Sequence, residues 1–213
     1  MEERFLRVDR TARYHVLGEV AAARNIWIVV HGYGQLARYF LTAFEDLAEE
    51  RLIVAPEGLS RFYTDDAHQR VGATWMTRED RLHEIDDHVA YLDALVASVG
   101  QVAPGLPVNG LGFSQGVATV TRWALRGRTR LHQLVLWGGQ LPPELDTAAL
   151  TNALSTTRID LVHGEQDKLV PERVFRDAEE RLRSAALTLR THTFPGGHAL
   201  DPVILSRCMK DGN

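Results

Sequence analysis

The segment from residue 108 to residue 125 constrains the fold of this chain more than any other. Residues 108–111 have the character of a short buried strand, and residues 117–125 have that of a helix. Between them stands Gly112-Phe113-Ser114-Gln115-Gly116, in which a serine lies between two glycines. Glycine permits the sharp turn and the close backbone approach that such a junction requires. The segment therefore predicts a strand that turns abruptly into a helix and presents Ser114 at the end of the strand.

Strand and helix patterns alternate along the rest of the chain. Short apolar runs predict strands, and apolar residues at steps of three and four predict helices. Further strands are predicted at 14–17, 26–30, 52–55, 134–137, 159–162 and 187–194, and helices at 36–47, 82–99, 171–183 and in a short tail from Pro202. Thr77 and Asp80 are predicted to cap the helix at 82–99. The alternation predicts one α/β domain over residues 1–213, with a mostly parallel central sheet and helices on both faces.

A serine hydroxyl is a poor nucleophile at neutral pH, so a catalytic Ser114 requires a general base. His198 follows the last predicted strand, in Pro195-Gly196-Gly197-His198. This places it at the edge of the sheet where the parallel strands end, which is also where Ser114 is expected. His192 lies inside that strand, and His163 ends another strand just before a glycine, where a structural role fits better. We therefore expect His198 to accept the proton of Ser114.

The base in turn requires an acid that orients it and stabilises its charged form. Asp167 stands after the predicted strand at 159–162 and just before a helix, where its carboxylate can reach the imidazole from the far side. Asp160 lies in the middle of that strand, and Glu165 comes two residues too early for the same turn. Asp146 is the second candidate, and a helix-capping role is the alternative for Asp167.

Acyl transfer also requires two N–H groups that stabilise the oxyanion. The backbone amide of Gln115, the residue after the serine, is one candidate. The other is the backbone amide of Tyr33 in His31-Gly32-Tyr33-Gly34, directly after the strand at 26–30. The glycines on both sides of Tyr33 allow the backbone to approach a substrate closely.

Taken together, these elements resemble the phospholipase/carboxylesterase family of α/β-hydrolases, the branch that includes the acyl-protein thioesterases. The motifs are His-Gly-x-Gly, Gly-Phe-Ser-Gln-Gly, His-Gly-x-x-Asp-x-x-Val-Pro and Gly-x-His, and they span residues 31–198. The order Ser114, Asp167, His198 is that of the α/β-hydrolases. The resemblance implies an α/β-hydrolase fold with a core sheet of eight strands or slightly fewer, no cofactor, and hydrolysis through an acyl-enzyme. Because such a core takes up the whole length of 213 residues, no separate lid domain is expected.

The chain differs from acyl-protein thioesterases at two positions of these motifs. Val117 stands where those proteins usually carry a further glycine, and Gln35 stands where an aspartate is common. Neither residue is the expected nucleophile, base or acid. We therefore expect a carboxylesterase of small to medium acyl esters. The alternatives are an acyl-protein or acyl-coenzyme A thioesterase, a lysophospholipase, or a non-catalytic ligand-binding protein with the same fold.

The segment 58–77 shows no clear periodicity and contains several large side chains. A long loop that leaves the carboxyl end of a strand is expected to overhang the active site. We therefore expect Phe62, Tyr63, Trp75 and Met76 to line a substrate pocket, with Trp75 as a wall. The alternative is that these aromatic residues anchor the segment to the core.

Composition excludes several classes of partner. The net charge of −4 and the scattered basic residues argue against nucleic acid or anionic lipid as the main partner. The chain has one cysteine, no secretory signal and no apolar run long enough to span a membrane, so a cytoplasmic protein is expected. No metal site is expected. The expected partner is a small-molecule ester, and a monomer and a homodimer both remain open.

Overall fold

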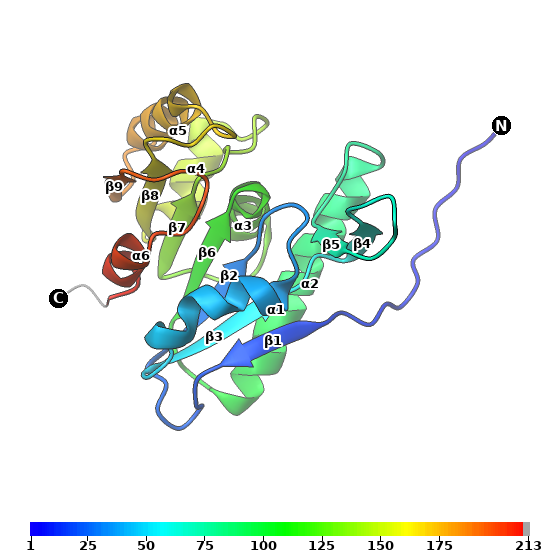
Figure 1. Cartoon of the computed structure of the whole chain (residues 1–213), viewed down its shortest axis with the longest axis horizontal. Helices are drawn as coiled ribbons and strands as arrows, with labels where there is room; N and C mark the ends of the chain where they lie inside the picture. Colours follow the sequence, from blue (N-terminus) through cyan, green and yellow to red (C-terminus); the bar gives the residue numbers. More distant parts are fainter. Residues whose placement is uncertain (211–213) are drawn as a thin grey trace.

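The computed structural model describes residues 1–210, which form a seven-stranded sheet flanked by helices and one separate hairpin (Figure 1). The order of strands in the sheet is β1-β3-β2-β6-β7-β8-β9. β1 runs antiparallel to β3, and all other neighbours are parallel. The sheet strands are β1 (Tyr14–Leu17), β2 (Asn25–Val30), β3 (Arg51–Pro56), β6 (Val108–Phe113), β7 (Gln133–Trp137), β8 (Arg158–Gly164) and β9 (Leu189–Phe194).

Helices cover both faces of this sheet, as the continuous apolar strands require. The residues of β2 alternate between two core clusters, because successive side chains of a strand point to opposite faces. Ile26, Ile28 and Val30 pack with one group of helices, and Trp27 and Val29 pack with the other. The first group is α2 (Arg81–Val102), α3 (Gln115–Arg126), α4 (Thr147–Leu154) and α5 (Glu172–Ser184); the second is α1 (Ala37–Phe40), a 3-10 helix (Leu41–Leu47) and α6 (Pro202–Met209).

The predicted α/β architecture is confirmed, with local differences. The helix expected at 36–47 is divided into α1 and a 3-10 helix. The helix α4 was not predicted, since it has only two turns and follows a pair of prolines. Its N-cap is Asp146, which accepts a hydrogen bond from the amide of Ala149 at 2.7 Å. The segment 58–77 contains a hairpin rather than an irregular loop, with β4 (Ser60–Tyr63) antiparallel to β5 (Val71–Thr74).

The predicted cap of α2 is also different. The helix begins at Arg81, and the side chain of its N-cap residue Asp80 forms no capping hydrogen bond. Glu84 instead accepts a hydrogen bond from the backbone amide of Thr77, so a first-turn carboxylate binds the chain that leads into the helix. In the described part of the chain, no helix combines the length and the apolar character needed to cross a bilayer.

Candidate active site

Ser114 stands at the turn between β6 and α3, in the backbone conformation φ +56°, ψ −117°. A non-glycine residue with positive φ is strained, and such strain is found at functional sites. The amide of Ser114 donates a hydrogen bond to the carbonyl of Trp137 in the neighbouring strand β7 at 2.9 Å. This bond fixes the serine at the carboxyl edge of the sheet, at the start of α3.

The glycines of the Gly-Phe-Ser-Gln-Gly segment are required by packing. A Cβ atom on Gly112 would lie 2.3 Å from the carbonyl oxygen of Gly116. No Cβ approaches a backbone oxygen so closely, and a backbone atom cannot move away as a side chain can. The strand and the first turn of the helix can therefore fold against each other only without a side chain at Gly112.

Asp167 and His198 form a hydrogen-bonded pair beside this turn. Nδ1 of His198 donates to Oδ2 of Asp167 at 2.7 Å. The Asp167 side chain is 1% exposed and that of His198 is 15% exposed, so the base retains an opening to solvent while the acid is enclosed. The ring of Phe113, the residue before Ser114, packs on the imidazole with the centroids 4.8 Å apart.

The surroundings of Asp167 favour its ionised form. Burial raises the pKa of this carboxyl, but the backbone amides of Val170 and Leu169 and the ring of His198 donate to it, and the net pKa is lowered. The two amides bind Oδ1 at 2.9 Å and 2.8 Å, which leaves Oδ2 for the imidazole. Asp167 therefore holds a negative charge against Nδ1 of His198.

Two glycines connect the serine with the acid–base pair. A Cβ atom on Gly138 would lie 3.6 Å from both Oδ2 of Asp167 and Nδ1 of His198. A Cβ atom on Gly139 would lie 2.2 Å from the carbonyl oxygen of Ser114. The chain directly after β7 thus passes beside all three residues. A side chain at Gly139 would overlap the carbonyl of Ser114, and Gly138 has a φ of +55°, which favours glycine. Sequence reasoning missed this pair, although two adjacent glycines after a buried strand were a visible signal.

The other candidate residues lie in structural roles. Oδ1 of Asp160 accepts from Nε2 of His192 at 2.8 Å and from Nε of Arg190 at 2.9 Å, so this carboxylate belongs to a separate buried cluster. The ring of His163 stacks on Phe175 in α5 at 5.1 Å. Asp146, the second candidate for the acid, is the N-cap of α4.

The cluster around Asp160 also contains the residues whose geometry would best suit a metal ion. Ligand atoms of Asp160, His192 and Cys208 lie within 4.8 Å of one another. However, both oxygens of Asp160 accept from Arg190, and Oδ2 also accepts from Nε2 of Gln133. Burial raises the pKa of the Cys208 thiol to about 12, which disfavours the thiolate form. These residues form an ion-pair cluster.

The turn after β2 approaches Ser114 from the other side. A Cβ atom on Gly32 would lie 3.1 Å from Cβ of Ser114. Nδ1 of the buried His31 bonds the carbonyl of Gly32 at 2.7 Å, and its Nε2 accepts from the amide of Gly58 at 3.0 Å. Only the neutral imidazole with its proton on Nδ1 satisfies both bonds. Burial accordingly lowers the pKa of His31.

Gln35 fixes the same turn, which sequence reasoning did not anticipate. Its Oε1 accepts from the amide of Gly32 at 2.7 Å, and its backbone carbonyl accepts from the amide of Ala73 in β5. The amide of Gly34 donates to the carbonyl of Ala73 at 2.9 Å. The turn that carries Tyr33 is therefore held between the residue Gln35 and the hairpin.

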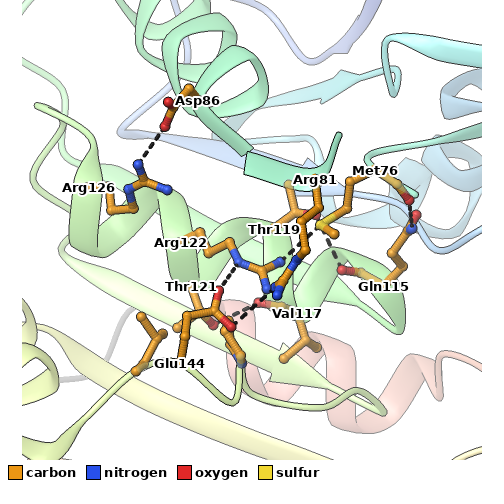
Figure 2. A network of polar contacts seen from close by, with 12 residues as sticks. Met76, Arg81, Asp86, Gln115, Val117, Thr119, Thr121, Arg122, Arg126 and Glu144 are labelled. Carbon is orange, nitrogen blue, oxygen red and sulfur yellow. Dashed lines mark hydrogen bonds and ion pairs between the residues drawn. The ribbon is translucent and has the colours of Figure 1, made fainter. Parts of the chain in front are cut away.

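A cleft of about 330 Å³ opens beside Gln115, the residue that follows the serine. The amide group of the Gln115 side chain bonds the backbone of the 74–76 segment: Nε2 donates to the carbonyl of Met76 at 3.0 Å, and Oε1 accepts from the amide of Trp75 at 3.2 Å. Figure 2 shows Gln115 and Met76 at one end of a polar network that continues along α3. The lining residues are Met76, Thr77, Arg78, Gln115, Ala118, Thr119, Arg122, Gln140, Leu141, Pro142 and Pro143.

The four residues expected to line a pocket occupy different environments. Met76 lines the cleft. Trp75 is 2% exposed, donates from its indole to the carbonyl of His31 at 2.9 Å, and belongs to the core. The interpretation of Trp75 as a pocket wall is therefore wrong, because the ring anchors the hairpin. Phe62 packs on the ring of Tyr33 at 5.0 Å, and Tyr63 is exposed on the hairpin; neither lines this cleft.

The chain matches a known protein family over most of its length. The model of the family described as phospholipase/carboxylesterase matches residues 14–210. No curated protein sequence matches the chain.

Solved structures share the fold at low identity. The esterase PE8 has a TM-score of 0.72 at 21% identity, over 94% of this chain and 100% of that one. Acyl-protein thioesterase 2 from Zea mays has a TM-score of 0.73 at 19% identity, over 92% and 96%. A carboxylesterase from Mesorhizobium loti has a TM-score of 0.72 at 19% identity, over 92% and 93%. The predicted α/β-hydrolase fold is confirmed.

Proposed function

Because the chain belongs to the phospholipase/carboxylesterase family, we propose that it is a serine carboxylesterase that hydrolyses small to medium acyl esters through an acyl-enzyme. One observation carries the proposal. Nδ1 of His198 donates to the buried carboxylate of Asp167 at 2.7 Å, next to a serine with strained backbone geometry. A binding protein would not need a base that an ionised carboxylate orients.

In the first half of the reaction, Oγ of Ser114 attacks the ester carbonyl and Nε2 of His198 accepts the hydroxyl proton. The Asp167 carboxylate stabilises the imidazolium through the bond at Nδ1. As the tetrahedral intermediate collapses, its bond to the alcohol oxygen breaks and His198 returns the proton to that oxygen. The alcohol leaves, and the acyl group remains bound to Ser114 as an ester.

The oxyanion accepts hydrogen bonds from the backbone amides of Tyr33 and Gln115. The amide of Gln115 lies in the first turn of α3, where N–H groups have no acceptor within the helix. In the turn after β2, the amides of Gly32 and Gly34 already donate to Gln35 and Ala73. The remaining amide between them is that of Tyr33, which supports its assignment as the second donor.

In the second half, a water molecule attacks the acyl-enzyme while Nε2 of His198 accepts its proton. The bond between the acyl carbon and Oγ of Ser114 then breaks, His198 returns the proton to Oγ, and the carboxylic acid is released. The cleft of about 330 Å³ beside Gln115 is at the small end of ligand pockets, which supports small to medium acyl groups.

Labelling with a fluorophosphonate tests the proposal directly, since such a reagent phosphonylates only an activated serine. We expect one phosphonyl group on the peptide that contains Ser114, and none on the variant Ser114→Ala. A series of 4-nitrophenyl esters from acetate to palmitate, each compared with its thioester, then defines the substrate. Faster turnover of the thioesters would favour the thioesterase alternative. A folded protein without labelling or turnover would favour a binding protein.

A further inference from the structure

The cleft beside Gln115 follows one face of α3 and ends at an arginine. Ala118 and Thr119 follow Gln115 by three and four positions and precede Arg122 by four and three, so the four side chains lie on the same side of the helix. Seven residues separate the first from the last, which corresponds to about 10 Å along the helix axis. Gln115, the residue after the expected nucleophile, lies at one end of this row and Arg122 at the other, so an acyl group that extends from Ser114 past Gln115 along the cleft would reach Arg122.

Most of the hydrogen-bonding capacity of the Arg122 guanidinium is not used by the protein. Its side chain is 5% exposed. Nε donates to Oε1 of Glu144 at 2.7 Å, and Nη1 contacts the sulfur of Met76 at 3.3 Å (Figure 2). A guanidinium has five N–H groups, so three of them have no acceptor among residues 1–210, and a fourth has only a weak one.

The charge around the cleft favours an anion. Arg78 and Arg122 line it, and no carboxylate does so. Both acidic residues nearby have partners: the second oxygen of Glu144 pairs with Arg81 at 3.4 Å, and Glu84 accepts from the amide of Thr77. Figure 2 shows the Glu144 carboxylate joined by dashed lines to the guanidinium groups of both Arg81 and Arg122.

A purely structural role explains Arg122 less well. An arginine that only joins α3 to the 140–144 segment would need one bidentate ion pair, and Glu144 is bound here through Nε alone. The Nη groups that Glu144 does not bind are not among the buried polar atoms without a partner, so they are open to the cleft, where a ligand carboxylate can accept two parallel hydrogen bonds from them. The Arg122 guanidinium thus has N–H groups that Glu144 does not bind and that are available to a ligand in the cleft.

We propose that this cleft binds the acyl part of esters whose far end carries a carboxylate, with Arg122 as the residue that recognises it. The substrate class is monoesters of linear dicarboxylic acids. The inference rests on the proposed function. The acyl side is assigned because the leaving alcohol must lie beside His198, which is not among the residues that line the cleft.

Two pairs of esters matched in length test the proposal. The mono-4-nitrophenyl esters of adipic and suberic acid are compared with 4-nitrophenyl hexanoate and octanoate, after subtraction of the rate without enzyme. We expect kcat/KM to be higher for the carboxylate-bearing ester of at least one pair, on the order of tenfold. Neutral esters hydrolysed equally well or better in both pairs would overturn the assignment of the cleft while the proposed function stood. No turnover of any ester would overturn both.

Two variants locate the preference. Arg122→Gln removes the charge and should lower the ratio of the two kcat/KM values about tenfold, towards unity. Arg126→Gln removes the same charge one turn further along α3, where Arg126 pairs with Asp86 outside the cleft, and should leave the ratio unchanged. An equal change in both variants would show a general charge effect and overturn the role of Arg122.

Product inhibition tests the same point in the unmodified enzyme, whatever the stability of the variants. With 4-nitrophenyl acetate as substrate, adipate is expected to inhibit competitively at concentrations about tenfold lower than hexanoate. Stronger or equal inhibition by hexanoate would overturn the proposal.

Discussion

Gly116 lies so close to the carbonyl of Val30 that a Cβ atom on it would stand 2.2 Å from that oxygen. The first turn of α3 is thus in backbone contact with the end of β2. This contact brings the turn that carries Tyr33 and the turn that carries Ser114 to the same point of the sheet edge. The distance explains why the second glycine of the Gly-Phe-Ser-Gln-Gly segment has no substitute.

Gly116→Ala is expected to lower both stability and activity. The added methyl group must push the helix away from β2, and overpacking of this kind costs about 1 to 3 kcal/mol. Urea unfolding measures the loss of stability. The rate of ester hydrolysis measures the effect of displacing the turn that carries Ser114. The matched control is Gly100→Ala in α2, where the new Cβ has no atom within 4 Å. It should gain up to about 1 kcal/mol from helix propensity. Equal stability of the two variants would contradict this account.

Replacing the nucleophile separates chemistry from backbone strain. Ser114→Ala should lower turnover on the order of 10⁴- to 10⁶-fold with little change in stability, since alanine keeps the same strained φ of +56°. Ser114→Gly should be equally inactive, yet more stable than Ser114→Ala by about 1 kcal/mol, because glycine adopts this conformation without strain. Thermal unfolding and 4-nitrophenyl ester hydrolysis provide both readouts. Activity retained in either variant would exclude Ser114 as the nucleophile.

Asp167→Asn should lower kcat on the order of 10³- to 10⁴-fold while the fold persists. The asparagine oxygen can still accept from the amides of Leu169 and Val170, but an NH₂ group facing Nδ1 of His198 favours the wrong tautomer. The control is Asp146→Asn, in which asparagine still caps α4. It should leave activity and stability unchanged. A larger loss of kcat from Asp146→Asn would reassign the acid.

The sequence predicted the places of Ser114, Asp167 and His198 in the fold better than the walls of the cleft. Ser114, Asp167 and His198 each stand at a strand end, and local patterns identify strand ends well. The cleft depends on contacts between distant segments, such as Gln115 with the 74–76 segment, and no local pattern encodes them. The sequence could not show whether Trp75 lines a pocket or packs in the core, because a large aromatic residue in a loop suits both. Its burial and its bond to the carbonyl of His31 place it in the core.

Stability is expected to fall as the pH decreases from 6.5 to about 4. Burial is the main cause that lowers the pKa of His88 to about 4 in the folded chain, whereas its ordinary pKa in the unfolded chain is 6.5. Between these pH values His88 is protonated in the unfolded chain and neutral in the folded chain, so protonation favours unfolding. This stabilisation is complete above pH 6.5 and is lost progressively below it, by about 1.4 kcal/mol per pH unit for one proton. Urea unfolding at several pH values measures the slope.

His88→Leu identifies this contribution. The variant should show a shallower slope between pH 6.5 and 4 than the unmodified chain, by about one proton. The slope that remains includes the contribution of the buried His31, whose pKa is also lowered. Parallel curves of unfolding free energy against pH for the two proteins would mean that the pKa of His88 is not lowered in the folded chain.

Trp75 and Met76 are neighbours in sequence, but their variants should affect different properties: stability for Trp75 and chain-length preference for Met76. Trp75→Ala removes a ring that is 2% exposed and should cost about 3 to 5 kcal/mol of unfolding free energy. Met76→Ala widens the cleft and should cost far less stability, while the ratio of kcat/KM between octanoyl and butyryl esters changes severalfold. Urea unfolding and the ester series provide the two measurements. A change in the ratio for Trp75→Ala with little loss of stability would contradict the conclusion that the ring anchors the hairpin to the core.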